Sequence, residues 1–97
     1  MTTDRDARLK KLRFRAWRRG FREADLILGP FADKHVEHLA ASEVDAFEQL
    51  LEVPDQDLYE WIVERSPTPP EYDTEVMRLI KQFRDNLPIT KGEIHGG

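Results

Sequence analysis

The chain has 97 residues, of which 39% are hydrophobic and 35% are charged, and its formal net charge is −4 at pH 7. A chain of this length fits one domain with a modest core, and it is too short to enclose a deep active site. It contains no cysteine, which excludes disulfide bonds and thiolate metal sites and agrees with a reducing compartment. The first residues lack the apolar core of a secretory signal, Asp4 and Asp6 argue against a transit peptide, and no apolar run is long enough to span a bilayer. We therefore expect a cytoplasmic protein.

The two signs of charge are unevenly distributed along the sequence. Residues 1–22 hold nine of the fifteen basic residues and two of the nineteen acidic ones, a net charge of +7, whereas the remainder carries −11. Such a division favours oriented docking on a charged partner.

The stretch RDARLKKLRFRAWRRG predicts a first helix. Leu9, Leu12 and Ala16 recur at helical spacing, and Phe14 and Trp17 beside them occupy positions that we expect a packed helix to bury. Arginines crowd the end of this helix, where the helix dipole favours cations, and Gly20 is the predicted C-terminal cap.

Four further segments show the helical period. The second helix begins near Phe21 or Arg22, and Pro30 inside it is expected to kink or split it. We expect Ser42 to cap the third helix and Asp55 to cap the fourth. The connection SPTPPEYD is stiff, and TEVMRLIKQFRDN forms the last helix. The expected inward-facing residues of these helices are Leu26, Ile27, Phe31 and Leu39, then Val44, Phe47, Leu50 and Leu51, then Leu58, Trp61 and Ile62, and finally Val76, Leu79, Ile80 and Phe83.

No alternating strand pattern or hairpin signal accompanies these helices. The sequence therefore predicts an all-α fold, a small single-domain bundle of about five helices. We expect residues 1–88 to form this domain and residues 89–97 to be a mobile tail, and we expect a monomer.

Catalytic and metal-binding patterns are weak in this sequence. There is no glycine-rich phosphate loop, HExxH motif or nucleophile elbow, so we do not expect an enzyme. His35 and His38 are three residues apart on a predicted helix, but that spacing alone indicates solvated side chains rather than a metal site. The carboxylates of the third and fourth helices indicate a solvated acidic face; they are Glu48, Glu52, Asp55, Asp57, Glu60 and Glu64.

The basic first helix leaves two other binding functions open. Arginines interleaved with aromatic residues can bind phosphates and stack on bases, and a basic amphipathic helix can lie on a membrane surface. Both are disfavoured if Phe14 and Trp17 are buried, and the acidic remainder repels a polyanion. Tyr59 and Tyr72 are candidate interface anchors if they are partly exposed.

The segment RRGFREAD, residues 18–25, places charges of both signs around Gly20. A glycine there serves as a helix cap, and it also allows the backbone of a partner to approach closely. Flanking arginines can bind carboxylates or carbonyls of that partner.

This segment carries the sequence Arg-Gly-x-x-Glu at Arg19, Gly20 and Glu23. The chain resembles the small flavinylation factors called SdhE in bacteria and succinate dehydrogenase assembly factor 2 in mitochondria, whose signature this is. LRFRAWRRGFREADLILGPFAD, FEQLLEVPDQDLYEWI and EVMRLIKQF are similar to successive blocks of that family, so the resemblance covers about residues 8–84. Family members often have leucine after the glutamate, where this chain has Ala24.

The resemblance implies an assembly factor that binds the flavoprotein subunit of succinate dehydrogenase and, in some bacteria, that of fumarate reductase. Such a factor promotes covalent attachment of FAD to a histidine of the flavoprotein, holds no FAD stably itself, and needs no metal or nucleic acid. It further implies that Arg19, Gly20 and Glu23 contact the flavoprotein, with Arg18, Arg22 and Asp25 as neighbours. An antitoxin-like or nucleic-acid-binding small helical protein is the alternative reading of the sequence.

Overall fold

The computed structural model describes residues 4–87, and every regular element in this part of the chain is helical. The five α-helices are α1 (Asp4–Trp17), α2 (Arg22–His35), α3 (Ala41–Leu51), α4 (Asp55–Ile62) and α5 (Glu75–Asp85). Two short 3-10 helices connect them, η1 (Val36–His38) and η2 (Pro70–Tyr72). The predicted small all-α domain is therefore confirmed, while the predicted tail, residues 89–97, lies outside the described residues.

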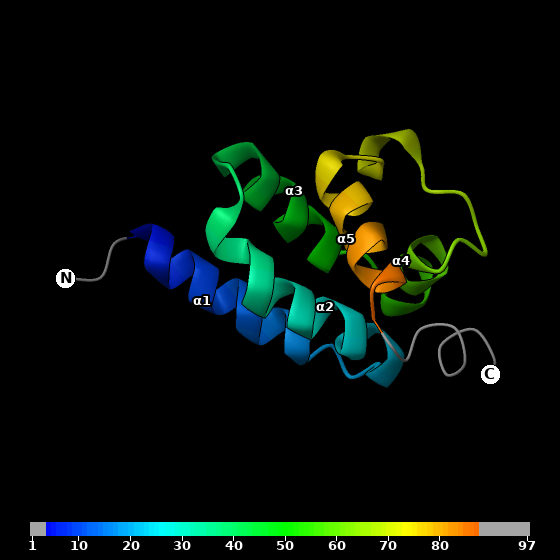
Figure 1. Ribbon diagram of the computed structural model, residues 1–97, viewed down its shortest axis with the longest axis horizontal. Helices are drawn as coiled ribbons and strands as arrows, with labels where there is room; N and C mark the ends of the chain where they lie inside the picture. The colour runs from blue at the N-terminus through cyan, green and yellow to red at the C-terminus, as the bar shows by residue number, and fades with distance from the viewer. Residues whose placement is uncertain (1–3, 88–97) are drawn as a thin grey trace.

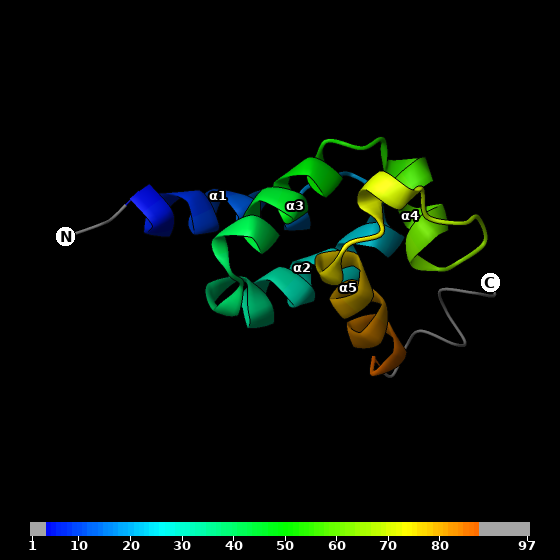
Figure 2. The ribbon, with the colours of Figure 1, turned by 90° about the horizontal axis from the view of Figure 1, so that it is seen from above.

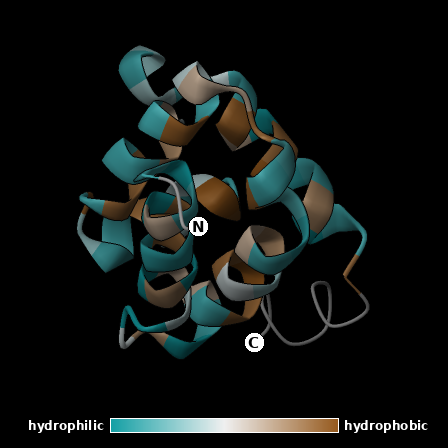
Figure 3. Cartoon of the chain, turned by 90° about the vertical axis from the view of Figure 1, so that its left-hand side faces the viewer, coloured by the Kyte–Doolittle hydropathy of each residue, from teal (hydrophilic) through white to brown (hydrophobic). Residues whose placement is uncertain are grey.

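The helices α1 and α2 form an antiparallel pair, and the other three helices pack over one side of it (Figure 1). The view from above shows α3 lying over this pair, with α4 and α5 near the end of the pair where α1 connects to α2 (Figure 2). Hydrophobic segments of the helices turn toward the centre of the bundle, and hydrophilic segments lie mainly on the outside (Figure 3). No described helix is both long and apolar enough to cross a membrane.

Phe31 of α2 lies at the centre of the core. Its ring is fully buried and makes edge contacts with Phe47 of α3 and Phe83 of α5, at centroid distances of 5.6 and 5.8 Å. His35 stacks on Phe31 at 5.1 Å and meets the edge of Phe83 at 5.6 Å. This position buries the imidazole in part, and burial lowers the pKa of His35.

The helix α2 continues through Pro30 to His35, so of the two expected effects of this proline, a kink or a split, the split does not occur. Two predicted helix caps are corrected. Ser42 does not cap α3, because this helix begins one residue earlier, at Ala41, and Glu43 accepts a hydrogen bond of 2.7 Å from the Ala40 amide. Asp55 is the first residue of α4 and not its cap, because Pro54 occupies the cap position.

The prediction that Phe14 and Trp17 are buried is wrong. Their side chains are 59% and 42% exposed, the largest exposed hydrophobic residues of the described chain. Leu12 and Ala16 already fill the face of α1 toward the bundle. Phe14 lies two residues from each of them, about 200° around the helix, and therefore points outward.

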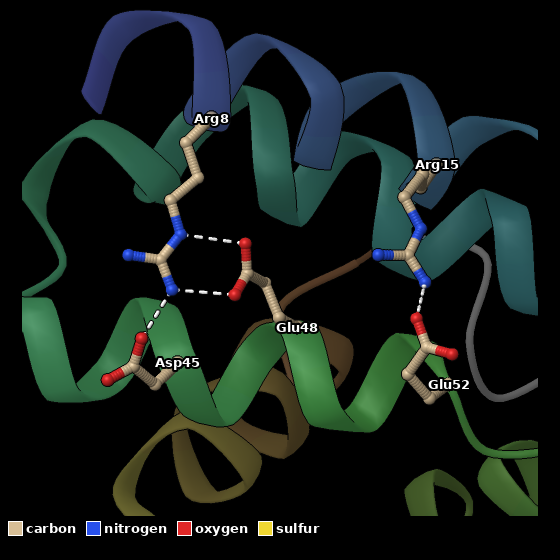
Figure 4. A network of polar contacts seen from close by, with 5 residues as sticks. All are labelled: Arg8, Arg15, Asp45, Glu48 and Glu52. Carbon is tan, nitrogen blue, oxygen red and sulfur yellow. Dashed lines mark hydrogen bonds and ion pairs between the residues drawn. The ribbon is translucent and has the colours of Figure 1, made fainter. Parts of the chain in front are cut away.

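At the predicted acidic face, Glu52, Asp57 and Glu64 are exposed as expected, and most carboxylates of this face also contact arginines. Glu48 accepts two hydrogen bonds from Arg8, at 2.7 and 2.6 Å, while Arg15 pairs with Glu52 (Figure 4). The bonds from Arg8 lower the pKa of Glu48. The basic helix α1 and the acidic helix α3 are thus neighbours in space, and much of the charge asymmetry of the sequence is neutralised within the domain.

Trp17 lies flat against α2 although it is partly exposed. A Cβ atom at Gly29 would be only 2.3 Å from Cδ2 of the indole, and the indole Nε1 donates a hydrogen bond of 3.0 Å to Asp33. Glycine at position 29 therefore makes room for the ring.

We predict that Gly29→Ala lowers the free energy of unfolding by about 1–2 kcal/mol, because the added methyl displaces the indole. In a Trp17→Ala background the same change should instead raise stability by up to about 1 kcal/mol, the difference in helix propensity between glycine and alanine. Urea unfolding of the four proteins measures this double-mutant cycle. An equal effect in both backgrounds would contradict the contact.

Candidate functional site

The turn between α1 and α2 has a conformation that favours glycine at position 20. The first helix ends at Trp17, three residues before the predicted cap, and Gly20 supplies a left-handed residue in the turn that follows, with φ of +85°. Gly20 is exposed, and a Cβ atom placed there would meet no described atom within 4 Å. The backbone conformation therefore favours glycine, and the space beside it is open.

Arg19 turns its side chain inward and joins this turn to the corner between α3 and α4. The side chain is only 6% exposed, and its Nη1 donates a hydrogen bond of 2.8 Å to the Leu51 carbonyl. Its Nη2 donates to the Val53 carbonyl. The Nε atom lies 2.6 Å from Asp55 Oδ1 as an ion pair, without the geometry of a hydrogen bond. Arg19 thus satisfies two carbonyls at the end of α3, which no longer have helical partners.

Asp25 supports the same turn from the first part of α2. Its Oδ1 accepts a hydrogen bond of 3.2 Å from the Arg19 amide, and the side chain is partly buried. Burial raises the pKa of Asp25, while the amides of Arg19 and Gly20 act in the opposite direction. The carboxylate therefore has a role within the domain.

The other residues predicted from the motif point outward. Arg22 and Glu23 are exposed, and their side chains make no hydrogen bond or ion pair with another described residue, although, in addition to burial, the charge of Glu23 contributes to raising the pKa of Tyr59. Arg18 is also exposed, with its guanidinium carbon 4.8 Å from the centroid of the Phe14 ring. The structure thus brings Arg18, Gly20, Arg22 and Glu23 together on the surface of one turn, which we call the Gly20 turn, and directs Arg19 and Asp25 into its base.

The turn rests on α4 through aromatic contacts that sequence reasoning missed. The ring of Phe21 lies 5.0 Å from that of Tyr59, which is 3% exposed. The possibility that Tyr59 is a half-exposed anchor is therefore wrong, and burial raises the pKa of its phenol. Ala24 is fully buried. Members of the family that the sequence resembles often have leucine at this position, so the smaller alanine affects packing beneath the turn.

The surface near the turn contains a shallow cavity of about 270 Å³. It is lined by Phe14, Arg15, Arg18, Arg19, Leu51 and Asp55. Pockets that enclose a drug-sized ligand have volumes of about 300–1,000 Å³, so this cavity is smaller than such a pocket. Within residues 4–87, no group of three or more histidine and carboxylate side chains is arranged to hold a metal ion.

Comparisons with known proteins agree with the resemblance of the sequence. Residues 10–84 match the model of a protein family described as the flavinator of succinate dehydrogenase. A succinate dehydrogenase assembly factor 2-A of Drosophila yakuba, described as mitochondrial, is 39% identical over 83 residues, which are 84% of this chain and 51% of the relative. The corresponding protein of Dictyostelium discoideum is 36% identical over 80 residues, 82% of this chain and 57% of the relative.

The chain spans about half the length of the curated relatives that it matches. The matched residues nevertheless include all five helices apart from the first turns of α1 and the last residue of α5, and they contain the whole Gly20 turn. The chain therefore belongs to the family of flavinators of succinate dehydrogenase.

Proposed function

We propose that this protein is an assembly factor that binds the flavoprotein subunit of succinate dehydrogenase through the Gly20 turn and promotes covalent attachment of FAD to a histidine of that subunit. The observation that carries the proposal is the open, charged surface of this turn. Gly20 leaves space for a partner's backbone, and Arg22 and Glu23 stand beside it without partners among the described residues. Membership in the flavinator family supports the identity of the partner.

The helper acts by orientation in this proposal. Covalent attachment requires the isoalloxazine ring, the acceptor histidine and the flavoprotein's own groups to be aligned. A protein that binds the aligned conformation more tightly than others raises its population, with no chemistry of its own. The rigid base made by Arg19 and Asp25 serves this role, because a preordered surface loses little entropy on binding.

The same proposal covers the remaining expectations from the sequence. FAD stays with the flavoprotein, since the cavity beside the turn is small and largely lined by charged side chains. The protein acts as a monomeric, non-catalytic helper in the cytoplasm, and the fumarate reductase flavoprotein is a second client where an organism has one.

We predict that Gly20→Arg abolishes flavinylation, because it places a large cation where the partner's backbone approaches. The test is co-expression with the flavoprotein subunit of the same organism in a host without its own flavinylation factor, with covalent flavin measured by in-gel fluorescence. Gly20→Ala is the matched control, since any side chain at φ of +85° is strained by about 1–2 kcal/mol while a methyl group meets no described atom.

Gly20→Ala should therefore lower the melting temperature about as much as Gly20→Arg and yet retain most flavinylation. Equal loss of flavinylation in the two variants would assign the glycine a conformational role only. Equal covalent flavin with and without wild-type protein would refute the proposed function.

We predict that Glu23 and Arg19 differ in what their loss affects. Glu23→Ala should change the free energy of unfolding by less than about 1 kcal/mol, the size of a helix-dipole effect, while flavinylation falls. Arg19→Ala should cost about 3 kcal/mol, because it leaves buried carbonyls and Asp55 without their cation. Arg19→Lys should recover little of this stability, since an ammonium group lacks the planar fork. Urea unfolding checks each value, and a stable Arg19→Ala protein without activity would make Arg19 a direct contact instead.

A further inference from the structure

The side of α1 that faces away from the bundle carries aromatic and basic side chains together. We call it the outer face of α1. Its exposed residues are Asp4, Ala7, Lys10, Lys11, Phe14, Trp17 and, directly after the helix, Arg18. With 59% of its side chain exposed, Phe14 is the most prominent apolar group on this face. Phe14, Trp17 and Arg18 are of types enriched at the centres of protein interfaces, whereas lysine is depleted there.

The cations of this face differ from the other cations of α1. Arg8, Arg13 and Arg15 pair with carboxylates of the domain, namely Glu48 and Asp45, Glu37 and Glu52. Lys10 and Lys11 form no ion pair with another described residue, and the guanidinium of Arg18 lies over the Phe14 ring without a carboxylate partner in the described chain. Three cations without an ion pair in the described chain therefore lie within about one helical turn of Phe14.

The aromatic rings of the outer face are held in place before any partner arrives. Trp17 lies against Gly29 and donates its indole hydrogen to Asp33. The guanidinium of Arg18 lies over the Phe14 ring, 4.8 Å from its centroid, which limits the freedom of both side chains. Such preordering favours recognition of a shaped surface, because less side-chain entropy is lost on binding.

Three other occupants fit this face less well. Trp17 lies flat against α2 and is therefore not directed into a bilayer. The acidic remainder of the chain repels the continuous polyanionic backbone of a nucleic acid. A second copy of the chain docked through the same face would bring its lysines against those of the first copy.

The outer face is continuous with the Gly20 turn. Phe14 and Arg18 line the cavity of about 270 Å³ whose other walls include Arg19 and Asp55. Three arginines line this cavity. Arg15 and Arg19 each pair with a carboxylate, whereas Arg18 has no carboxylate partner in the described chain. A partner that covers the Gly20 turn therefore also reaches Phe14.

We infer that the outer face of α1 is a second contact surface for the same flavoprotein, and that the flavoprotein presents carboxylates around an apolar pocket that receives Phe14. This inference rests on the proposed function. It assigns the affinity mainly to Phe14 and the steering of association to the unpaired cations.

The test measures the dissociation constant between the full chain and the purified flavoprotein subunit by titration calorimetry. Phe14→Ser should weaken binding by about 10- to 30-fold without a change in melting temperature, because the ring is outside the core. Lys11→Glu should weaken it by about three- to tenfold, and more at low salt. Lys34→Glu is the matched control with the same change in charge, because this exposed lysine lines a separate groove between α2 and α5. It should change the dissociation constant by no more than about twofold.

Each result separates the inference from the proposed function. If the wild-type protein binds and neither Phe14→Ser nor Lys11→Glu changes the dissociation constant, the inference is overturned, while the proposed function of the Gly20 turn is not affected. No binding by wild type would overturn both. Vesicles of phosphatidylcholine and phosphatidylserine, and a single-stranded RNA, serve as further probes, and Phe14-dependent binding to either would overturn the assignment to an acidic protein surface.

Discussion

The contact between an arginine side chain and the carbonyls at a helix end is the interaction on which the arrangement of this domain depends. Arg19 donates to Leu51 at the end of α3 and to Val53 just after it, and Arg84 donates to Ile62 at the end of α4. Arg5 donates to Leu39 after η1 at 2.9 Å. The last carbonyls of a helix have no helical donor, and a buried carbonyl without any donor costs free energy. A planar, permanently charged guanidinium meets this need at several junctions and thereby fixes one helix against another.

The arginines and lysines of the N-terminal segment therefore serve two purposes. Some are part of the domain's internal structure, as with Arg8 on Glu48 and Arg19 on the α3–α4 corner. Others, such as Lys11 and Arg22, are exposed and have no ion-pair partner among the described residues. The composition of the sequence does not distinguish the two groups of cations, but only the second group is available to a partner.

Local patterns in the sequence predict much of this fold, because each helix has its own apolar period. The stripe of Leu9, Leu12 and Ala16 is correct, and so is the burial of Phe31 and Phe47. Contacts between distant segments could not be predicted in this way. The inward position of Arg19 depends on where α3 ends, which no pattern around residue 19 encodes. The outward position of Phe14 was within reach of sequence reasoning, since Leu12 and Ala16 already define the buried side of that helix.

The hydrogen bonds from the Arg19 side chain to the Leu51 and Val53 carbonyls, which we call the Arg19 clamp, have a consequence for the order of folding. These bonds join residues separated by 32 and 34 positions, whereas α1 and α2 meet across a short turn. The helical hairpin can form from local contacts, but the clamp requires α3 to be in place as well. The turn around Gly20 consequently acquires its fixed shape only after the segment through Val53 has been synthesised and packed. A binding partner that recognises this shape distinguishes the folded domain from a nascent one.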